Sequence, residues 1–242
     1  MIGTASFRPG PGAQRTHCRI TTDTVYRGEH GRRDCRPVQS RRGSISFVDN
    51  VATARIYARW PNDVQLDRFA EDPRVLCARL AVARPFVVQR DDPFVELSTI
   101  EEALGRQEAH RIALRFAGAI ESTDYWKHAF QGRFAGVGEL IAADPDCAAG
   151  TYFEAYLLLD DIREVECLKA AGYDGAIYAG SGASAGDVEY RVFSSAQVRF
   201  VDVPFDPLDD RADCGVAART GRAESEFARE SRRRTTCRST GP

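Results

Sequence analysis

The order of strand-like and helix-like segments limits the possible folds of this chain more than any other sequence feature. Short runs of β-branched and aromatic residues, which favour strands, occur near both ends of the region 21–205. Segments whose apolar residues recur at helical spacing lie mainly between them. Strands and helices that are grouped in this way are typical of α+β proteins, whereas βαβ units would alternate. The sequence therefore predicts an α+β domain.

Local patterns give the expected elements. A capping box, Ser98 to Glu101, would open the central helical region, and Gly172 would close the last helix as its C-terminal glycine. The expected strands are 24–28, 44–47, 75–82, 86–88, 174–179, 188–193 and 197–203. The expected helices run from Asp49 or Asn50 to about 57–59, from Ser98 in short pieces to about 143, and over 162–171.

Charge and cysteine usage reduce the number of functional classes. The chain has 33 Lys and Arg against 35 Asp and Glu, whereas a general nucleic-acid coat protein would be strongly basic. Its seven cysteines form no CxxC pair, so neither a zinc site nor a disulfide framework is supported, and reduced cytosolic thiols are expected. No run of about 18 apolar residues is present, so no membrane span is expected.

Both ends of the chain differ in composition from the region between them. Residues 1–20 are rich in Gly, Pro, Arg and Thr, and residues 206–242 have mixed charges and a single aromatic residue, Phe227. Neither segment could bury a core, so both are expected to be disordered tails around a domain at 21–205. The segment Met1 to Cys18 has no apolar stretch, so no secretory signal is expected.

Two strand segments near the N-terminus contain polar residues that suit ligand binding. Arg27, next to the permissive Gly28, could bind a phosphate or carboxylate through its planar fork. Ser44 and Ser46 would share one face of a strand, where their hydroxyls could bind a ribose, an amide or a catalytic carboxylate. Tyr57, on the following helix, could stack on a planar ring. Each pattern alone also fits an ordinary surface strand or core packing.

A third segment near the C-terminus brings two carboxylates together. Asp187 and Glu189 are two residues apart, so on a strand both would project to the same face. One could stabilise positive charge while the other orients or deprotonates an acceptor. The preceding loop, Gly180 to Gly186, contains only small residues and lacks the GK[ST] ending of a phosphate-binding loop. A solvent-facing hairpin is the alternative interpretation.

Together and in this order, the three segments resemble the ADP-ribosyltransferase superfamily. Its arginine subclass has an Arg on the first strand, a Ser-x-Ser motif on the second and a Glu at the start of a later one, which correspond to Arg27, Ser44–Ser46 and Glu189. The chain also resembles a phage and mobile-element, toxin-like branch, and the resemblance covers about residues 23–201. The matching landmarks are Ser46-Phe47-Val48-Asp49-Asn50, Ala54, Tyr57-Ala58, Gly172-Tyr173-Asp174-Gly175, Glu189-Tyr190-Arg191-Val192-Phe193 and Gln197-Val198.

Two positions depart from the family pattern. Many members of the phage branch have His where Arg27 stands, and His30 is three residues too late to replace it. Members of the superfamily have Glu or Gln two residues before the catalytic Glu, where this chain has the shorter Asp187. The second difference concerns the acceptor that the protein would modify.

The resemblance implies two small antiparallel sheets that form a cleft for NAD, the substrate, with flanking helices. Glu189 would stabilise the positive charge that develops on the ribose, Ser46 would orient Glu189, and Asp187 would face the acceptor. The implied NAD-binding residues are Arg27 for phosphate or ribose, Gly28 for close approach of the amide, Ser44 for the nicotinamide side, and Phe47 or Tyr57 for stacking.

The implied reaction is transfer of ADP-ribose from NAD to a macromolecular acceptor, with release of nicotinamide. A protein side chain is the first expectation for the acceptor, a nucleic-acid base remains open, and neither metal nor membrane is involved. The protein would be a bacterial toxin-like enzyme, an effector or a phage factor that acts in a cytoplasm. The alternatives are an NAD glycohydrolase and a non-catalytic binding module. The four histidines, His17, His30, His110 and His128, are scattered, which disfavours a Ser–His–Asp or metal hydrolase.

Overall fold

The computed structural model describes residues 20–21, 24–29, 43–59, 73–89, 91–203, 206 and 208–209. One compact unit ends at Asp202, and all strands and helices below belong to it. The tails predicted at 1–20 and 206–242 lie almost entirely outside the described residues. Within those residues, no helix is long and apolar enough to cross a membrane.

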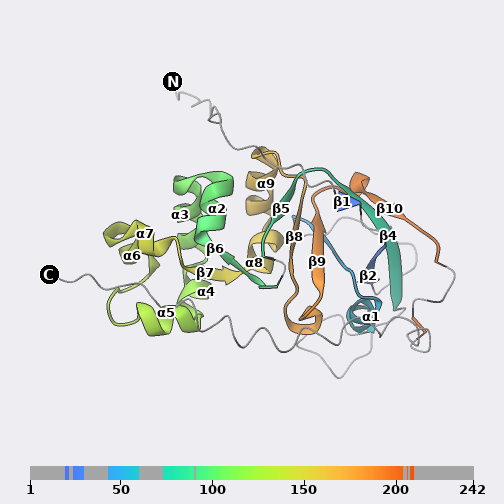
Figure 1. Cartoon of the computed structure of the whole chain (residues 1–242), viewed down its shortest axis with the longest axis horizontal. Helices are drawn as coiled ribbons and strands as arrows, with labels where there is room; N and C mark the ends of the chain where they lie inside the picture. The colour runs from blue at the N-terminus through green and yellow to red at the C-terminus, as the bar shows by residue number, and fades with distance from the viewer. Residues whose placement is uncertain are drawn as a thin grey trace. The chain divides into compact units, whose positions relative to one another are not determined.

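The elements follow the predicted order of strands, helices and strands (Figure 1). The strands are β1 (Ile20–Thr21), β2 (Val25–Glu29), β3 (Ile45–Val48), β4 (Arg74–Val82), β5 (Pro85–Val87), β6 (Phe94–Glu96), β7 (Tyr152–Glu154), β8 (Gly175–Ala179), β9 (Val188–Val192) and β10 (Val198–Phe200). The α-helices are α1 (Val51–Arg59), α2 (Leu97–Leu104), α3 (Arg106–Arg115), α4 (Ala117–Ser122), α5 (Asp124–Ala129), α6 (Val137–Ala143), α7 (Pro145–Ala148), α8 (Ala155–Asp160) and α9 (Ile162–Ala170). Two 3-10 turns are η1 (Gly182–Ser184) and η2 (Ser195–Gln197).

The described strands form an eight-stranded mixed sheet and a separate antiparallel pair, β6–β7, rather than the two small antiparallel sheets that were expected. Seven strands follow the order β1-β4-β2-β3-β9-β8-β5, β10 pairs with β4, and the β5–β8 pair is parallel. Among the residues described, a single register pair, Tyr26↔Val48, joins β2 to β3. We call β1, β4, β2 and β10 the first half-sheet and β3, β9, β8 and β5 the second half-sheet.

The two faces of the sheet bury different cores. Along β9 the side chains alternate, so Tyr190 and Val192 join a small core with Phe47, whereas Glu189 and Arg191 point to the opposite face. That opposite face of the second half-sheet packs through Tyr178 against a larger helical core. Figure 1 shows α2 and α3 above the β6–β7 pair and α4 and α5 below it, with α8 and α9 between this helical region and the large sheet.

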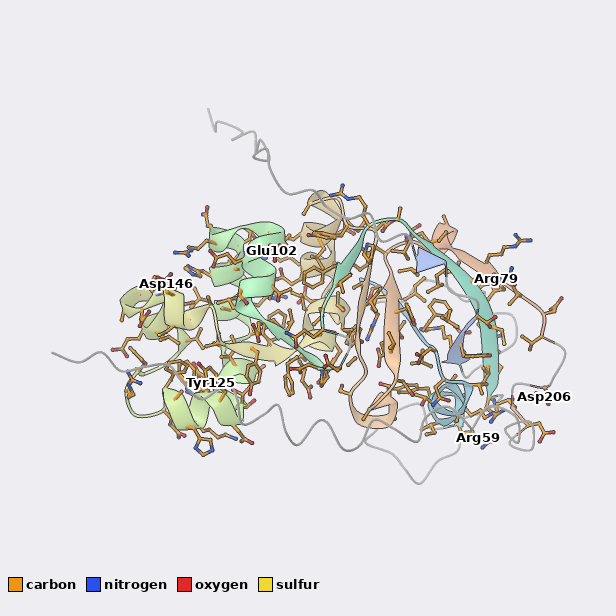
Figure 2. The ribbon with its side chains drawn as sticks, in the orientation of Figure 1. Arg59, Arg79, Glu102, Tyr125, Asp146 and Asp206 are labelled. Atoms are coloured by element: carbon orange, nitrogen blue, oxygen red, sulfur yellow. The ribbon has the colours of Figure 1, made fainter. Side chains whose placement is uncertain are left out.

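Aromatic side chains connect the helical region to the β6–β7 pair. Tyr125 of α5, labelled in Figure 2, stacks on Tyr152 of β7 with the ring centroids 5.8 Å apart and the ring planes 21° apart. Phe116 stacks on Phe153 with the centroids 4.9 Å apart. These pairs fix β7 against α4 and α5.

The segment from Gly172 to Gly175 positions β8. The prediction that Gly172 closes the last helix is confirmed: its φ is +88°, and its N–H donates to the Lys169 carbonyl, as in a Schellman motif. The Asp174 carboxylate then accepts the backbone N–H groups of Ala83 and Arg84 at 2.8 and 2.7 Å. This aspartate therefore fixes the β4–β5 turn next to β8.

The predicted capping box at Ser98 is wrong. Helix α2 begins at Leu97, and Glu96 at its N-cap makes no capping hydrogen bond through its side chain. The first N–H groups of the helix instead donate to backbone, Leu97 to the Thr151 carbonyl and Ser98 to the Ala149 carbonyl. Because a distant segment satisfies these donors, no side-chain cap is needed.

Gly28 of β2 lies against α1, and we expect its replacement by Ala to destabilise the protein. A Cβ there would overlap the Ala54 carbonyl oxygen and lie 2.5 Å from the Ala58 nitrogen. Such overpacking against backbone costs about 1–3 kcal/mol or more in the free energy of unfolding, measurable by urea denaturation.

Gly118→Ala in α4 is the matched control for Gly28→Ala. A Cβ at Gly118 would meet no atom within 4 Å, so this change should stabilise the protein by about 0.5–1 kcal/mol. If Gly28→Ala were as stable as the wild type, the close approach of α1 to β2 would be incorrect.

Candidate functional site

Arg27 and Ser46 meet where the two half-sheets join. Arg27 Nη1 donates to the Ser46 carbonyl oxygen at 3.0 Å and to Ser46 Oγ at 3.3 Å. Arg27 Nε donates to Glu29 Oε1 at 2.9 Å, and Arg74 donates to the other Glu29 oxygen at 2.8 Å. The Arg27 side chain therefore bridges β2 and β3 where their backbone pairing is limited. Hydrogen bonds on two sides fix the plane of its guanidinium group.

Glu189 lies on β9 with both carboxylate oxygens hydrogen-bonded, and it is only 7% exposed. Its Oε1 accepts from Ser184 Oγ at 2.5 Å. Its Oε2 accepts from the Tyr178 hydroxyl and from Arg191 Nη2, the latter at 3.4 Å. A buried carboxylate with several hydrogen-bond donors is held in a fixed orientation.

Arg191 balances the negative charge around Glu189. Its Nη1 donates to Asp160 Oδ1 at 2.6 Å, and its Nη2 donates to the Tyr178 hydroxyl oxygen at 2.6 Å. Burial raises the pKa of Tyr178 well above its usual value, and the Glu189 charge raises it further, so the hydroxyl remains protonated and donates to Glu189. Burial acts to lower the pKa of Arg191, but Tyr178, Glu189 and Asp160 outweigh it and raise that pKa overall.

Tyr57 of α1 reaches the same carboxylate through Ser184. The Tyr57 hydroxyl lies 3.2 Å from Ser184 Oγ, which in turn donates to Glu189. Tyr57 also packs beside Gly28, whose added Cβ would lie 2.8 Å from the Tyr57 Cβ. The structure thus joins Tyr57 to Glu189 through Ser184, places Gly28 beside Tyr57, and separately joins Arg27 to Ser46.

Asp187 precedes β9 and has partners different from those of Glu189. Its Oδ1 accepts from Asn50 Nδ2 at 3.0 Å, and its Oδ2 accepts from the Thr53 hydroxyl. Asn50 also caps α1 by accepting the Ala52 N–H at 2.9 Å. The Asp187 carboxylate therefore lies at the N-terminus of α1, where the helix dipole favours a negative charge.

Ser44 and Phe47 are not part of the group around Glu189. The Ser44 hydroxyl donates to the Leu159 carbonyl oxygen at 2.6 Å, and Ser44 is 3% exposed. Phe47 is buried in the small core with Val25 and Leu80. Both side chains hold the second half-sheet in place, Ser44 against the end of α8 and Phe47 against the first half-sheet.

Asp49 gives a prediction about the pH dependence of stability. Burial raises the pKa of Asp49, repulsion from Asp187 raises it further, and its hydrogen bond from the Val188 N–H, at 3.1 Å, opposes both. A carboxyl whose pKa is raised in the folded state binds protons better when folded, so its penalty is present at neutral pH and disappears as the pH falls through that pKa. Asn at this position keeps the acceptor for Val188 and removes the repulsion.

We therefore expect Asp49→Asn to be more stable than the wild type at pH 7, and the difference to vanish below the ordinary Asp pKa of 3.8. Urea denaturation at a series of pH values measures this. Asp91→Asn, at an exposed position in the turn before β6, is the control and should show no such dependence. Lower stability of Asp49→Asn at pH 7 would contradict the repulsion between Asp49 and Asp187.

Sequence patterns did not point to four residues that complete the site: Asp160, Tyr178, Ser184 and Arg191. One signal was present, because Arg191 follows Glu189 by two residues and so shares its face on a strand. Tyr178 stands opposite Glu189 in the β8–β9 register, which only the structure shows. The sequence had no comparable signal for Ser184 or Asp160, because their contacts depend on the loop and on α8.

Comparisons with known proteins do not assign this site. No family model, curated protein or solved structure matches the chain. Among the residues placed by the structure, no group of three or more His, Cys, Asp or Glu side chains could hold a metal ion. The chemistry of the site is therefore inferred from its own geometry.

Proposed function

We propose that this chain is an ADP-ribosyltransferase that cleaves NAD and transfers ADP-ribose to a macromolecular acceptor. The observation that supports this best is that Arg27 hydrogen-bonds Ser46 where the two half-sheets join, and that Tyr57 is linked to Glu189 of the neighbouring strand β9 through a shared hydroxyl. These residues come from β2, β3, α1 and β9, which are distant in sequence. They are the types that the resemblance assigns to NAD binding and cleavage.

Glu189 is the proposed catalytic residue. When the bond between the ribose C1′ and the nicotinamide nitrogen breaks, its electron pair leaves with nicotinamide, and positive charge develops on the ribose. A buried carboxylate stabilises that charge more strongly than an exposed one, because less water screens it. Each carboxylate oxygen accepts about two hydrogen bonds, so Glu189 can also accept from a ribose hydroxyl while Ser184 and Tyr178 hold it.

Arg27 and Tyr57 are the proposed NAD-binding side chains. Because Arg27 Nε and Nη1 are bound to Glu29 and Ser46, its Nη2 is the nitrogen that would donate to a phosphate of NAD. The Tyr57 ring, held beside Gly28, would stack on nicotinamide. We leave Ser44 and Phe47 out of this proposal because the fold uses both side chains elsewhere.

A second candidate is an NAD glycohydrolase, in which water takes the place of the acceptor. The arrangement of Asp187 favours it, because both oxygens of that carboxylate bind α1 rather than facing outward toward an acceptor. In both reactions Glu189 has the same task, and only the group that attacks C1′ differs.

Incubation with NAD labelled in the adenylate phosphate, with and without bacterial lysate, tests the proposal. A transferase labels a protein, or a nucleic acid if the acceptor is a base. A glycohydrolase yields labelled free ADP-ribose whether or not lysate is present. Recovery of intact NAD in both incubations would contradict both activities and leave a non-catalytic binding module.

A further inference from the structure

We infer that Ser184, and not Ser46, is the residue that positions Glu189 for cleavage of NAD. This inference rests on the proposed function. Ser46 Oγ lies against Arg27, whereas Ser184 Oγ lies 2.5 Å from Glu189 Oε1. Ser184 has no exposed surface, so its hydroxyl is held within the protein next to the carboxylate.

The hydrogen-bonding capacity of Ser184 determines where its proton points. A serine hydroxyl has one proton and two lone pairs. Two acceptors lie within reach, Glu189 Oε1 at 2.5 Å and the Ser181 carbonyl oxygen at 2.9 Å. The charged carboxylate is the stronger and closer acceptor, so the proton is donated to Glu189. A lone pair of Ser184 Oγ then accepts from the Tyr57 hydroxyl at 3.2 Å.

The loop of small residues explains how Ser184 reaches this position. The Gly180 N–H donates to the Asp187 carbonyl oxygen and the Asp187 N–H donates to the Ser184 carbonyl oxygen, both at 2.9 Å, which closes the loop on itself. An added Cβ at Gly180 would overlap the Ser184 carbonyl oxygen and Oγ. A larger side chain at Gly180 would therefore displace Ser184 from Glu189.

This geometry gives Ser184 a positioning role. Its hydrogen bond fixes the orientation of the Glu189 carboxylate. Tyr57 is hydrogen-bonded to the same hydroxyl. Ser184 therefore holds both the catalytic carboxylate of Glu189 and the Tyr57 ring, which is proposed to stack on nicotinamide. Loss of the hydroxyl should therefore affect turnover more than NAD binding.

The test compares Ser184→Ala with wild type and with Ser181→Ala, the same change in the same loop. Nicotinamide release from NAD is followed across a series of NAD concentrations, and thermal denaturation checks that each variant is folded. We expect Ser184→Ala to lower kcat about tenfold or more with little change in KM, the effect of one lost hydrogen bond to a charged group.

Ser184→Cys keeps the shape and supplies a weaker donor, so it should fall between wild type and Ser184→Ala. Ser181→Ala should match wild type. Unchanged kcat in Ser184→Ala, while wild type turns over, would overturn the inference and leave the proposed function intact. A lower kcat in Ser184→Ala that Ser184→Cys does not partly restore would also overturn it, because the hydrogen bond to Glu189 would then not be the cause. No nicotinamide release by wild type would overturn the proposed function, and the inference with it.

Discussion

Glu189→Gln is expected to lower the rate of nicotinamide release by about 10² or more, the effect of removing one preorganised electrostatic group. Gln has nearly the shape of Glu but no charge, so it cannot stabilise the cationic ribose. Since that charge exists mainly in the transition state, NAD binding should change far less than kcat. Steady-state kinetics together with calorimetric titration of NAD measure the two effects separately.

The control for Glu189→Gln is Glu102→Gln, at an exposed position of α2 that Figure 2 labels. It makes the same chemical change on the helical region and should leave kcat unaltered. The amide that Glu189→Gln introduces would also meet donors from Ser184 and Tyr178, so the unfolding temperature of this variant must be recorded beside its rate. Wild-type turnover by a folded Glu189→Gln protein would show that Glu189 is not the catalytic carboxylate.

Arg191→Met is expected to lower the free energy of unfolding by about 3–5 kcal/mol, which is the cost of removing one partner of a buried ion pair. The Arg191 side chain is 6% exposed and donates to Asp160, Tyr178 and Glu189. Without it, Glu189, Tyr178 and Asp160 would lose a buried guanidinium that donates to all three. Urea denaturation at neutral pH measures the loss.

Arg199→Met on the exposed strand β10 is the control for Arg191→Met. It removes an arginine from the same sheet and should change stability by no more than about 0.5 kcal/mol. A loss of stability in Arg191→Met no larger than in Arg199→Met would contradict a buried charge network around Glu189.

The sequence predicted the order of elements well, because strand and helix patterns are local. The α+β grouping and the helix after Asn50 required only periodicity and capping residues. The sequence did not predict the eight-stranded mixed sheet, because β9 hydrogen-bonds both β3 and β8 and so joins segments distant along the chain. Nor did it predict the short strands β6 and β7, which form a separate pair.

For the candidate site, the sequence located individual residues better than their partners. Arg27 and Ser46 were singled out separately, and the structure shows a hydrogen bond between them. Asp187 and Glu189 were expected on one face of a strand, but β9 begins at Val188, so Asp187 follows the loop and turns toward α1. Ser184 could not have been distinguished from its small neighbours, because its importance comes from the closed path of the loop.

Several landmarks of the family resemblance have structural tasks in this chain. Gly172 ends α9, Asp174 binds the β4–β5 turn, and the Gln197 side chain donates to the Asp174 carbonyl oxygen at 2.7 Å. These residues support the arrangement of β4, β8 and η2 and take no part in the proposed chemistry. The resemblance therefore combines residues that specify the fold with a smaller set, Arg27, Tyr57 and Glu189, proposed to act on NAD.

The most direct measurement is chromatographic quantification of nicotinamide after incubation of the purified full chain with NAD. If the chain cleaves NAD as proposed, nicotinamide accumulates in proportion to protein concentration and time, and the accumulation nearly stops in Glu189→Gln. Full recovery of intact NAD from the wild-type protein, with lysate as well as without it, would contradict the proposal that this site cleaves NAD.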